Sequence, residues 1–470
     1  MTAKQKIAPK NGRLTETELL KLEAKYCSWG DTVHYSDELT MFERASGSFL
    51  YDMTGTEYLD LQMWYSAANF GYGNRRLNTA LKKQIDKLPQ LACQYLHEEK
   101  ILLAASIARL MENTFKEKGR VHFNVGGSAA VEDSIKVVRN HTSRSMVFAF
   151  MGGYHGRTLG ASAITSSYRY RERFGHFADR ACFIPYPYCF RCPYQKHKDS
   201  CDMFCLKQFE RLFETEYYSF VNNKTGKSEC GAFFIEAIQG TGGYIAPPAG
   251  YFKGLKKLLD RYNILLVDDE IQMGFYRTGK FWAIEHFDVT PDILVFGKAM
   301  TNGLNPLSGI WAKEKLISPT VFPPGSTHST FSSNPLGTAV ALESMKLIEE
   351  SDFSVSVPRK GEYLMSRLND MKRRYPEIGD VEGIGLAIRV EICQKDGYTP
   401  NKALTDAVAG LGLSGKLKSG GKKRGLILDV GGYYKNVFTL APSLYITEKE
   451  MDLGMDLFEE ALIKAIKAVS

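Results

Sequence analysis

The sequence predicts an α/β protein that has a large domain, built on a mainly parallel and doubly wound sheet, and a smaller second domain. Its 470 residues, of which 44% are hydrophobic, are enough for an extensive core. From residue 77 onward, short apolar runs alternate with helical patterns, which is typical of a parallel sheet. Two of the runs, ILLV at residues 264–267 and ILVF at residues 293–296, have the length of buried parallel strands.

The N-terminal part predicts a small mixed unit. Apolar residues among charges predict a partly amphipathic helix over residues 16–28. Residues 41–61 alternate β-rich runs with glycine-containing turns, which predicts an antiparallel meander. The loop at residues 64–74 mixes aromatic and small residues, and it fits a pocket wall and a buried connection equally well. Two helical stretches between residues 77 and 110 then lead into the large domain.

Charge and composition predict a cytoplasmic enzyme that binds neither nucleic acid nor membrane. The 60 basic and 53 acidic residues give a net charge of +7 that is spread along the chain. The one dense basic run, residues 416–424, is interpreted as a solvated loop. The first fourteen residues have no hydrophobic signal core, and no segment approaches the ~18 apolar residues of a membrane span. Nine irregularly spaced cysteines fit a reducing compartment.

Four of the cysteines form a cluster in the sequence. Cys189, Cys192, Cys201 and Cys205 have the spacing C-x2-C-x8-C-x3-C in a segment rich in tyrosine and proline. Four thiolates can hold zinc tetrahedrally, although the second pair is spaced loosely. We favour an inserted surface loop with free or occasionally paired thiols and no metal, and structural zinc remains the alternative.

An acid and an amine follow the two central strands. Asp268, Asp269 and Glu270 follow the first run, and Lys298 follows the second. The carboxyl ends of parallel strands are where open α/β sheets bind ligands. A lysine buried there has a lowered pKa and attacks carbonyl groups, while a nearby carboxylate can keep a ring nitrogen protonated. This pair of residues suits pyridoxal phosphate (PLP).

Two glycine-rich turns add weaker signals. Gly127 and Ser128 lie where a short strand meets a helix, and the free amides of a helix start can bind a phosphate, although such turns often only cap the helix. Tyr154 and His155 follow another strand, where the tyrosine ring could stack on a planar cofactor or serve as a plain loop residue. Glu236 follows a third strand and reaches the same sheet edge.

Together these motifs resemble the class III aminotransferases, from about residue 41 to residue 468. The resemblance is carried by DDEIQMGFYRTGKFWAIEH at residues 268–286 and PDILVFGKAMTNGLNPLSG at residues 291–309. It implies the fold of type I PLP enzymes, with a small α+β domain built from both termini. The implied division is residues 1–75 and 346–470 for the small domain and residues 76–345 for the large PLP-binding domain.

The resemblance also implies roles for residues around the PLP ring. Lys298 would bond covalently to the cofactor and later act as the general base, and Asp269, rather than Asp268, would pair with the ring nitrogen. Gln272 would lie near the ring hydroxyl, and Ile271 would pack against one ring face.

The resemblance likewise implies which residues contact the PLP phosphate and the other face of the ring. Gly127 and Ser128 align with the phosphate-binding turn, Tyr154 with the aromatic residue on the other ring face, and Glu236 with the glutamate of the EP-x-QG segment. Thr330 aligns with a threonine that enters the neighbouring subunit's phosphate site. The resemblance therefore implies a homodimer with shared active sites.

Three departures from the family pattern bear on the substrate. Ala129 replaces the glutamate of the phosphate turn, and Ala237 replaces a proline, but neither change removes a catalytic group. Thr439 stands where members specific for amino acids carry an arginine for the α-carboxylate, and threonine cannot form that two-point contact. We therefore expect a substrate without an α-carboxylate: a primary amine, an ω-amino compound or an amino sugar, as in aminoglycoside-pathway members.

The leading interpretation is transamination between an amine donor and an aldehyde or ketone. The alternative is a racemase or epimerase on the same scaffold, because both reactions begin by removing a proton from Cα. Racemisation is helped by a second acid opposite Lys298, for which Tyr154, His155 and Tyr65 are candidates. A binding protein without catalysis is disfavoured, because lysine, acid, stacking ring and phosphate turn are all present.

Overall fold

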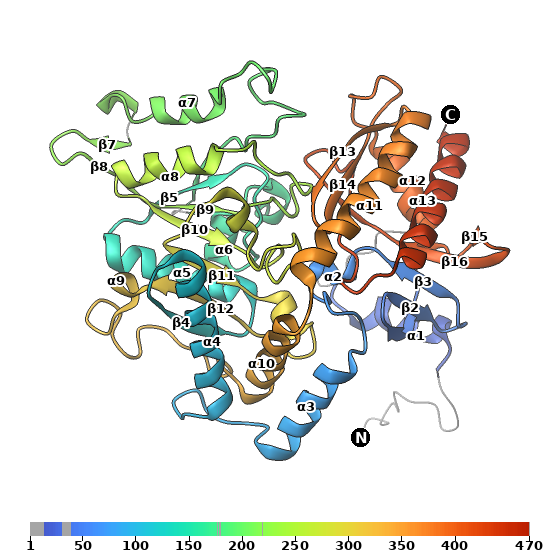
Figure 1. Ribbon diagram of the computed structural model, residues 1–470, viewed down its shortest axis with the longest axis horizontal. Coiled ribbons are helices and arrows are strands. Elements are labelled where there is room, and N and C mark those ends of the chain that lie inside the picture. The colour runs from blue at the N-terminus through green and yellow to red at the C-terminus, as the bar shows by residue number, and fades with distance from the viewer. Residues whose placement is uncertain (1–13, 31–38, 176, 178–179, 219, 470) are drawn as a thin grey trace, which may run out of the picture.

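A seven-stranded sheet forms the centre of the larger part of the molecule (Figure 1). The computed structural model describes residues 14–30, 39–175, 177, 180–218 and 220–469. Residues 1–13, which carry most of the segment inspected for a signal core, lie outside the described residues. The strand order is β4 (Gly119–Asn124), β12 (Ser308–Lys313), β11 (Ile293–Phe296), β10 (Leu265–Asp269), β9 (Cys230–Ile235), β5 (Met146–Phe150) and β6 (Cys182–Ile184).

The predicted mainly parallel sheet is confirmed. Strands β11, β10, β9, β5 and β6 are mutually parallel, and only β12 runs antiparallel to its neighbours β11 and β4. Along β10, Leu265 and Val267 belong to the core on one face of the sheet and Leu266 to the core on the other. Both faces are therefore buried, which explains why the strand has no alternation of apolar and polar residues.

Helices cover both faces of this sheet. One face packs against α5 (Gly127–Thr142), α6 (Leu159–Ala163) and α9 (Glu314–Ile317). The other layer contains α4 (Glu98–Phe115), α7 (Phe204–Arg211) and α8 (Tyr251–Arg261). Next to α4 lie α3 (Arg75–Lys87) and α10 (Pro335–Glu349). The remaining short elements are the hairpin β7 (Val221–Asn222) and β8 (Lys227–Ser228), and the 3-10 turns η1 (Tyr168–Tyr170), η2 (Glu216–Tyr218), η3 (Ala283–Phe287) and η4 (Lys298–Thr301).

A four-stranded antiparallel sheet lies beside the large one, on the right in Figure 1. Its order is β13 (Ile378–Ile384), β14 (Ala387–Ile392), β18 (Val437–Leu440) and β17 (Asp429–Gly431). Three helices pack around it: α11 (Phe353–Arg374), α12 (Lys402–Leu413) and α13 (Glu448–Val469).

A five-stranded sheet combines the two ends of the chain. The predicted meander is present as β1 (Phe42–Ser46), β2 (Phe49–Asp52) and β3 (Glu57–Asp60), preceded by α1 (Glu16–Tyr26). Strand β16 (Lys422–Ile427) pairs in parallel with β3, and β15 (Leu417–Ser419) forms the edge. The domain boundaries after residues 75 and 345 stay a prediction. In the described part of the chain, every helix is too short or too polar to cross a lipid bilayer.

Residues 416–424 are largely exposed, as predicted, but they form strands and not a loop. The segment is the hairpin β15–β16, and its turn uses Gly420 and Gly421, which both have positive φ angles. Lys422 and Arg424 form ion pairs with Glu57 on β3. The basic residues are thus partly neutralised by a strand that lies far away in the sequence, which composition alone does not reveal.

Candidate active site

The predicted site residues meet at the carboxyl ends of the parallel strands. Asp269 ends β10, Lys298 follows β11, Glu236 follows β9, and Tyr154 and His155 lie in the turn after β5. The strands bring together four chain segments that are separated by up to 144 residues, the interval from Tyr154 to Lys298. This edge is where a parallel sheet is expected to bind a ligand.

Lys298 lies at the centre of this site. It begins η4 with a φ of 43°, in the left-handed region, and its Nζ donates a hydrogen bond to Gln272 Oε1 at 3.1 Å. Burial lowers the pKa of Lys298 to about 8, although the carboxylates of Asp269, Glu236 and Asp429 oppose this shift. A substantial fraction of the amine is therefore neutral near physiological pH and able to act as a nucleophile or base.

Asp269 is held by His155. Asp269 is 6% exposed and His155 is 2% exposed, and the imidazole Nδ1 donates to Asp269 Oδ2 at 2.8 Å. Burial alone would lower the pKa of His155, but the hydrogen bond and the negative charges of Asp269 and Glu236 raise it overall. The backbone amide of Ile271 donates to Asp269 Oδ1 at 3.2 Å. These bonds fix the orientation of the carboxylate.

Asp268 has a different environment from its neighbour. It is completely buried, and burial together with the nearby Glu270 raises its pKa well above the usual range. Successive side chains of a strand point to opposite faces of the sheet, so Asp268 and Asp269 cannot share one partner. Asp269 faces His155, whereas both carboxylate oxygens of Asp268 are buried without a hydrogen-bond partner among the described residues.

The start of α5 offers an anion site. No side chain caps this N-terminus, which leaves the first backbone amides of a sixteen-residue helix open to a ligand. The Ser128 hydroxyl accepts a hydrogen bond from the Arg157 amide at 3.1 Å. A Cβ atom on Gly127 would lie 2.9 Å from the Ile271 side chain, and one on Gly156 would lie 2.2 Å from Ser128 Oγ. Glycine is therefore needed where these turns approach each other.

Glu236 joins two of the turns. Its carboxylate accepts hydrogen bonds from the amides of Tyr154 at 2.9 Å and Gly240 at 2.8 Å, while burial raises its pKa to about 7. The Tyr154 ring packs edge-on against Tyr170, with their centroids 5.1 Å apart. The glutamate thus positions the stacking tyrosine predicted from the sequence.

The structure adds residues that the sequence reasoning missed. The Tyr244 hydroxyl accepts a hydrogen bond from Gln272 Nε2 at 3.1 Å, which continues the chain of contacts from Lys298. Asp429 accepts hydrogen bonds from the Thr439 hydroxyl at 2.5 Å and from Gln62 Nε2 at 3.4 Å. Asp429 lies ten residues before the position inspected for an arginine, but only the pairing of β17 with β18 reveals that the two side chains meet.

The residues of the loop 64–74 differ in burial, and Thr330 is exposed. The short helix α2 (Met63–Ser66) has φ angles of 45° to 63° throughout, a left-handed turn whose Trp64 is 53% exposed and covers Gly303. Residues 66–71 are buried, which agrees with a buried connection, and the pocket-wall interpretation stays a prediction. Tyr65 is half-buried, and Thr330 is exposed next to Phe331.

The four clustered cysteines surround one small cavity of about 20 Å³, and all are free thiols. Throughout the residues that the structure describes, no three or more His, Cys, Asp or Glu side chains are grouped so that they could hold a metal ion. The choice between free thiols and zinc stays a prediction, which a metal assay on the pure protein would test directly.

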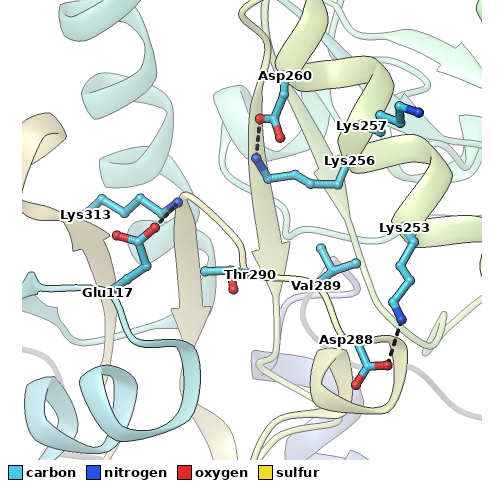
Figure 2. Close-up of a pocket in the computed structure, with 9 residues that line it drawn as sticks. All are labelled: Glu117, Lys253, Lys256, Lys257, Asp260, Asp288, Val289, Thr290 and Lys313. Carbon is cyan, nitrogen blue, oxygen red and sulfur yellow. Dashed lines mark hydrogen bonds and ion pairs between the residues drawn. The ribbon is translucent and has the colours of Figure 1, made fainter.

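A larger hollow of about 470 Å³ lies away from this site and carries no catalytic arrangement. Figure 2 shows that its charged side chains pair with one another: Lys253 with Asp288, Lys256 with Asp260, and Lys313 with Glu117. Because its cations are largely neutralised, the hollow does not have the character of an anion site.

The residues at the strand ends fit PLP. Lys298 supplies an amine with a lowered pKa, Asp269 a fixed carboxylate, and α5 an uncapped N-terminus for a phosphate. When bound, PLP supplies a protonated ring that stabilises negative charge on the substrate carbon.

Comparisons with known proteins agree with this fit. An alanine/serine racemase of Pyrococcus horikoshii is 34% identical over 95% of this chain and 90% of its own, and a leucine/methionine racemase of Thermococcus litoralis is 34% identical over 89% of each. A 5-aminovalerate aminotransferase of Pseudomonas putida is 30% identical over 89% of this chain and 92% of its own.

A solved aminotransferase structure has a similar fold. The taurine:2-oxoglutarate aminotransferase of Bifidobacterium kashiwanohense, in complex with PLP and glutamate, superimposes with a TM-score of 0.85 at 25% identity, covering 97% of this chain and 99% of that one. A family model described as aminotransferase class-III matches residues 32–462. The chain therefore belongs to the class-III aminotransferase family of PLP-dependent enzymes.

Proposed function

We propose that this enzyme transfers an amino group between an amine donor and an aldehyde or ketone acceptor, and that its principal substrate lacks an α-carboxylate. Primary amines, ω-amino compounds and amino sugars meet this description. The observation that carries the proposal is the placement of Lys298 beside Gln272 at the sheet edge that also holds Asp269 and His155.

Each of these residues has a definite task. Lys298, neutral above a pKa of about 8, removes the proton from the substrate carbon and returns a proton at the other reacting position. Asp269, oriented by His155, would pair with the ring nitrogen. Ile271 and Tyr154 would hold the ring between them, and the amides of Gly127 and Ser128 would hold the phosphate.

The position of Thr439 supports a substrate without an α-carboxylate. Its side chain is completely buried, and its hydroxyl already donates to Asp429. Neither residue provides the two parallel N–H donors with which arginine binds a carboxylate. A carboxylate placed beside Asp429 would also meet a charge of the same sign.

The proposal includes a cytoplasmic homodimer. Thr330 and the 71% exposed Phe331 lie on the surface of the single chain, where a second subunit could cover them and receive the threonine. Analytical ultracentrifugation tests this part, and an active monomer contradicts it. A role in aminoglycoside formation is the most specific form of the proposal and depends on activity with amino sugars.

A substrate panel tests the proposed reaction. Purified holoenzyme is mixed with amino sugars, primary amines, 4-aminobutyrate, ornithine and alanine, and the change in cofactor absorbance is followed with mass spectrometry of the carbonyl product. We expect kcat/KM to be highest for amines without an α-carboxylate. A clear preference for α-amino acids would contradict the substrate assignment while leaving transamination intact.

Racemisation is the second candidate, because both racemases compared above are 34% identical to this chain. Of the three candidate second acids, His155 donates a hydrogen bond to Asp269 at 2.8 Å, and Tyr154 and Tyr65 are the other two. Loss of deuterium from Cα of a labelled amino acid, without a carbonyl product, would support racemisation over transamination.

A further inference from the structure

A third carboxylate, in addition to Asp269 and Glu236, acts on Lys298. Asp429 begins β17 and is partly buried. Its negative charge, like those of Asp269 and Glu236, favours the protonated form of Lys298. The cofactor roles account for the other two acids, and they leave Asp429 without a function.

Strand pairing fixes the position of Asp429. It is the register partner of Thr439 on β18, and the threonine hydroxyl donates to Oδ2 at 2.5 Å. Gln62 Nε2 donates to Oδ1 at 3.4 Å. A carboxylate has about four acceptor sites, so these two bonds leave capacity for a ligand that donates hydrogen bonds.

The segment that carries Asp429 contacts the turns around the cofactor. The amide of Gly432 donates to the Thr241 carbonyl at 3.1 Å, in the turn that follows Glu236. The Tyr433 hydroxyl donates to the Met151 carbonyl at 2.8 Å, in the turn that leads to Tyr154. These bonds hold β17 against the active site, so Asp429 is part of its wall.

Asp429 interacts with positively charged groups of the chain itself, which its carboxylate attracts. Burial raises the pKa of Asp429, while Lys435 in the turn after β17, like Lys298, opposes that rise. Burial lowers the pKa of Lys435, and the positive charge of Arg169 adds to that effect. A buried carboxylate gains most from a partner that brings a full positive charge and N–H donors.

We propose that Asp429 binds a second, protonated amino group of the amine donor, so that the enzyme prefers diamines or amino sugars with a further amino group. The proposal rests on the transamination proposed above and narrows its substrate class. The hydroxyl of Thr439 then orients Asp429 for this ammonium group, in the place where an arginine would bind a carboxylate.

Three four-carbon donors test the proposal, because they differ only at the far end: 1,4-diaminobutane, 1-aminobutane and 4-aminobutyrate. The cofactor absorbance change gives kcat/KM for each donor with the wild-type holoenzyme and with Asp429→Asn, which keeps an acceptor for Thr439. We expect the wild type to favour the diamine over 1-aminobutane at least tenfold. Asp429→Asn should lower kcat/KM for the diamine about tenfold more than kcat/KM for 1-aminobutane, the difference expected for a charged hydrogen bond.

Asp406→Asn is the matched control, because Asp406 is an exposed acid on α12 that pairs with Lys402. It should leave all three donors unchanged. The inference is overturned if the wild type prefers 4-aminobutyrate, or if Asp429→Asn lowers kcat/KM equally for diamine and monoamine. Equal losses would mean that Asp429 serves Lys298 or the fold.

Binding separates a failure of this inference from a failure of transamination. If none of the three amines transfers its amino group, their affinities are measured from quenching of the cofactor fluorescence. Tighter binding of the diamine than of 1-aminobutane, lost in Asp429→Asn, would support the subsite even though the proposed reaction had failed. Equal affinities would overturn it.

Discussion

The hydrogen bond between His155 and Asp269 provides a quantitative test of the active site. Replacing His155 with leucine removes the donor but keeps an apolar side chain in the buried position. The bond is 2.8 Å long and joins two residues that are 2% and 6% exposed, so water cannot replace the imidazole easily. A hydrogen bond to a charged group contributes about 1.5–3 kcal/mol, and each 1.36 kcal/mol is a factor of ten. We expect kcat/KM to fall by roughly 10- to 150-fold.

The assay follows the cofactor absorbance during the reaction with a good amine donor. His155→Gln retains an N–H donor and should recover part of the lost activity, whereas a purely structural role would not distinguish it from leucine. In an Asp269→Asn background the leucine substitution should add little, because the charged acceptor is already gone. His141→Asn, at an exposed histidine near the end of α5, is the control. A loss below threefold in His155→Leu, or fully additive losses in the double variant, would refute the reasoning.

Three further predictions concern Lys298 and the subunit contact. Lys298→Ala should bind the cofactor without a covalent bond, so that borohydride reduction no longer attaches the cofactor to the protein. Its kcat should fall by roughly a thousandfold. Attachment of the cofactor at another lysine would contradict the assignment. Because only the neutral amine attacks a carbonyl, cofactor capture by the apoenzyme should accelerate with pH up to the Lys298 pKa of about 8 and then level off. A rate that still rises between pH 9 and 10 would mean that burial does not lower this pKa. Thr330→Val should raise the dissociation constant for PLP severalfold without changing the mass of the dimer, and an unchanged constant would remove Thr330 from the phosphate site.

The sequence predicts the large sheet and the residues at its edge well, because these features depend on local patterns. The apolar runs that became β10 and β11 need no partner to be recognised, and the acid and lysine that follow them mark the edge. The choice of Asp269 over Asp268 came from the family spacing. The structure gives the two carboxyl groups different surroundings, because Asp268 is buried near Glu270 while Asp269 accepts a hydrogen bond from His155.

Features that depend on contacts between residues far apart in the sequence are harder to predict. The hairpin at residues 416–424 was interpreted as a loop because its charges find their partner, Glu57, more than 360 residues away. Asp429 was missed for the same reason, since its meeting with Thr439 depends on the register of β17 and β18. Strand register is set by turns and by the buried faces of neighbouring elements, which single-sequence patterns describe poorly.

The parallel pairing of β3 with β16 also limits how the chain can fold during synthesis. Tyr58 and Gly425 are register partners, so 366 further residues must be translated after Tyr58 before its partner exists. At 5–20 residues per second this takes about 20 to 70 s. The meander of β1, β2 and β3 therefore emerges from the ribosome long before its fourth strand, with one edge open to pairing with other chains. A ribosome that stalls before residue 422 would leave that edge unprotected, even after the strands of the seven-stranded sheet have been made.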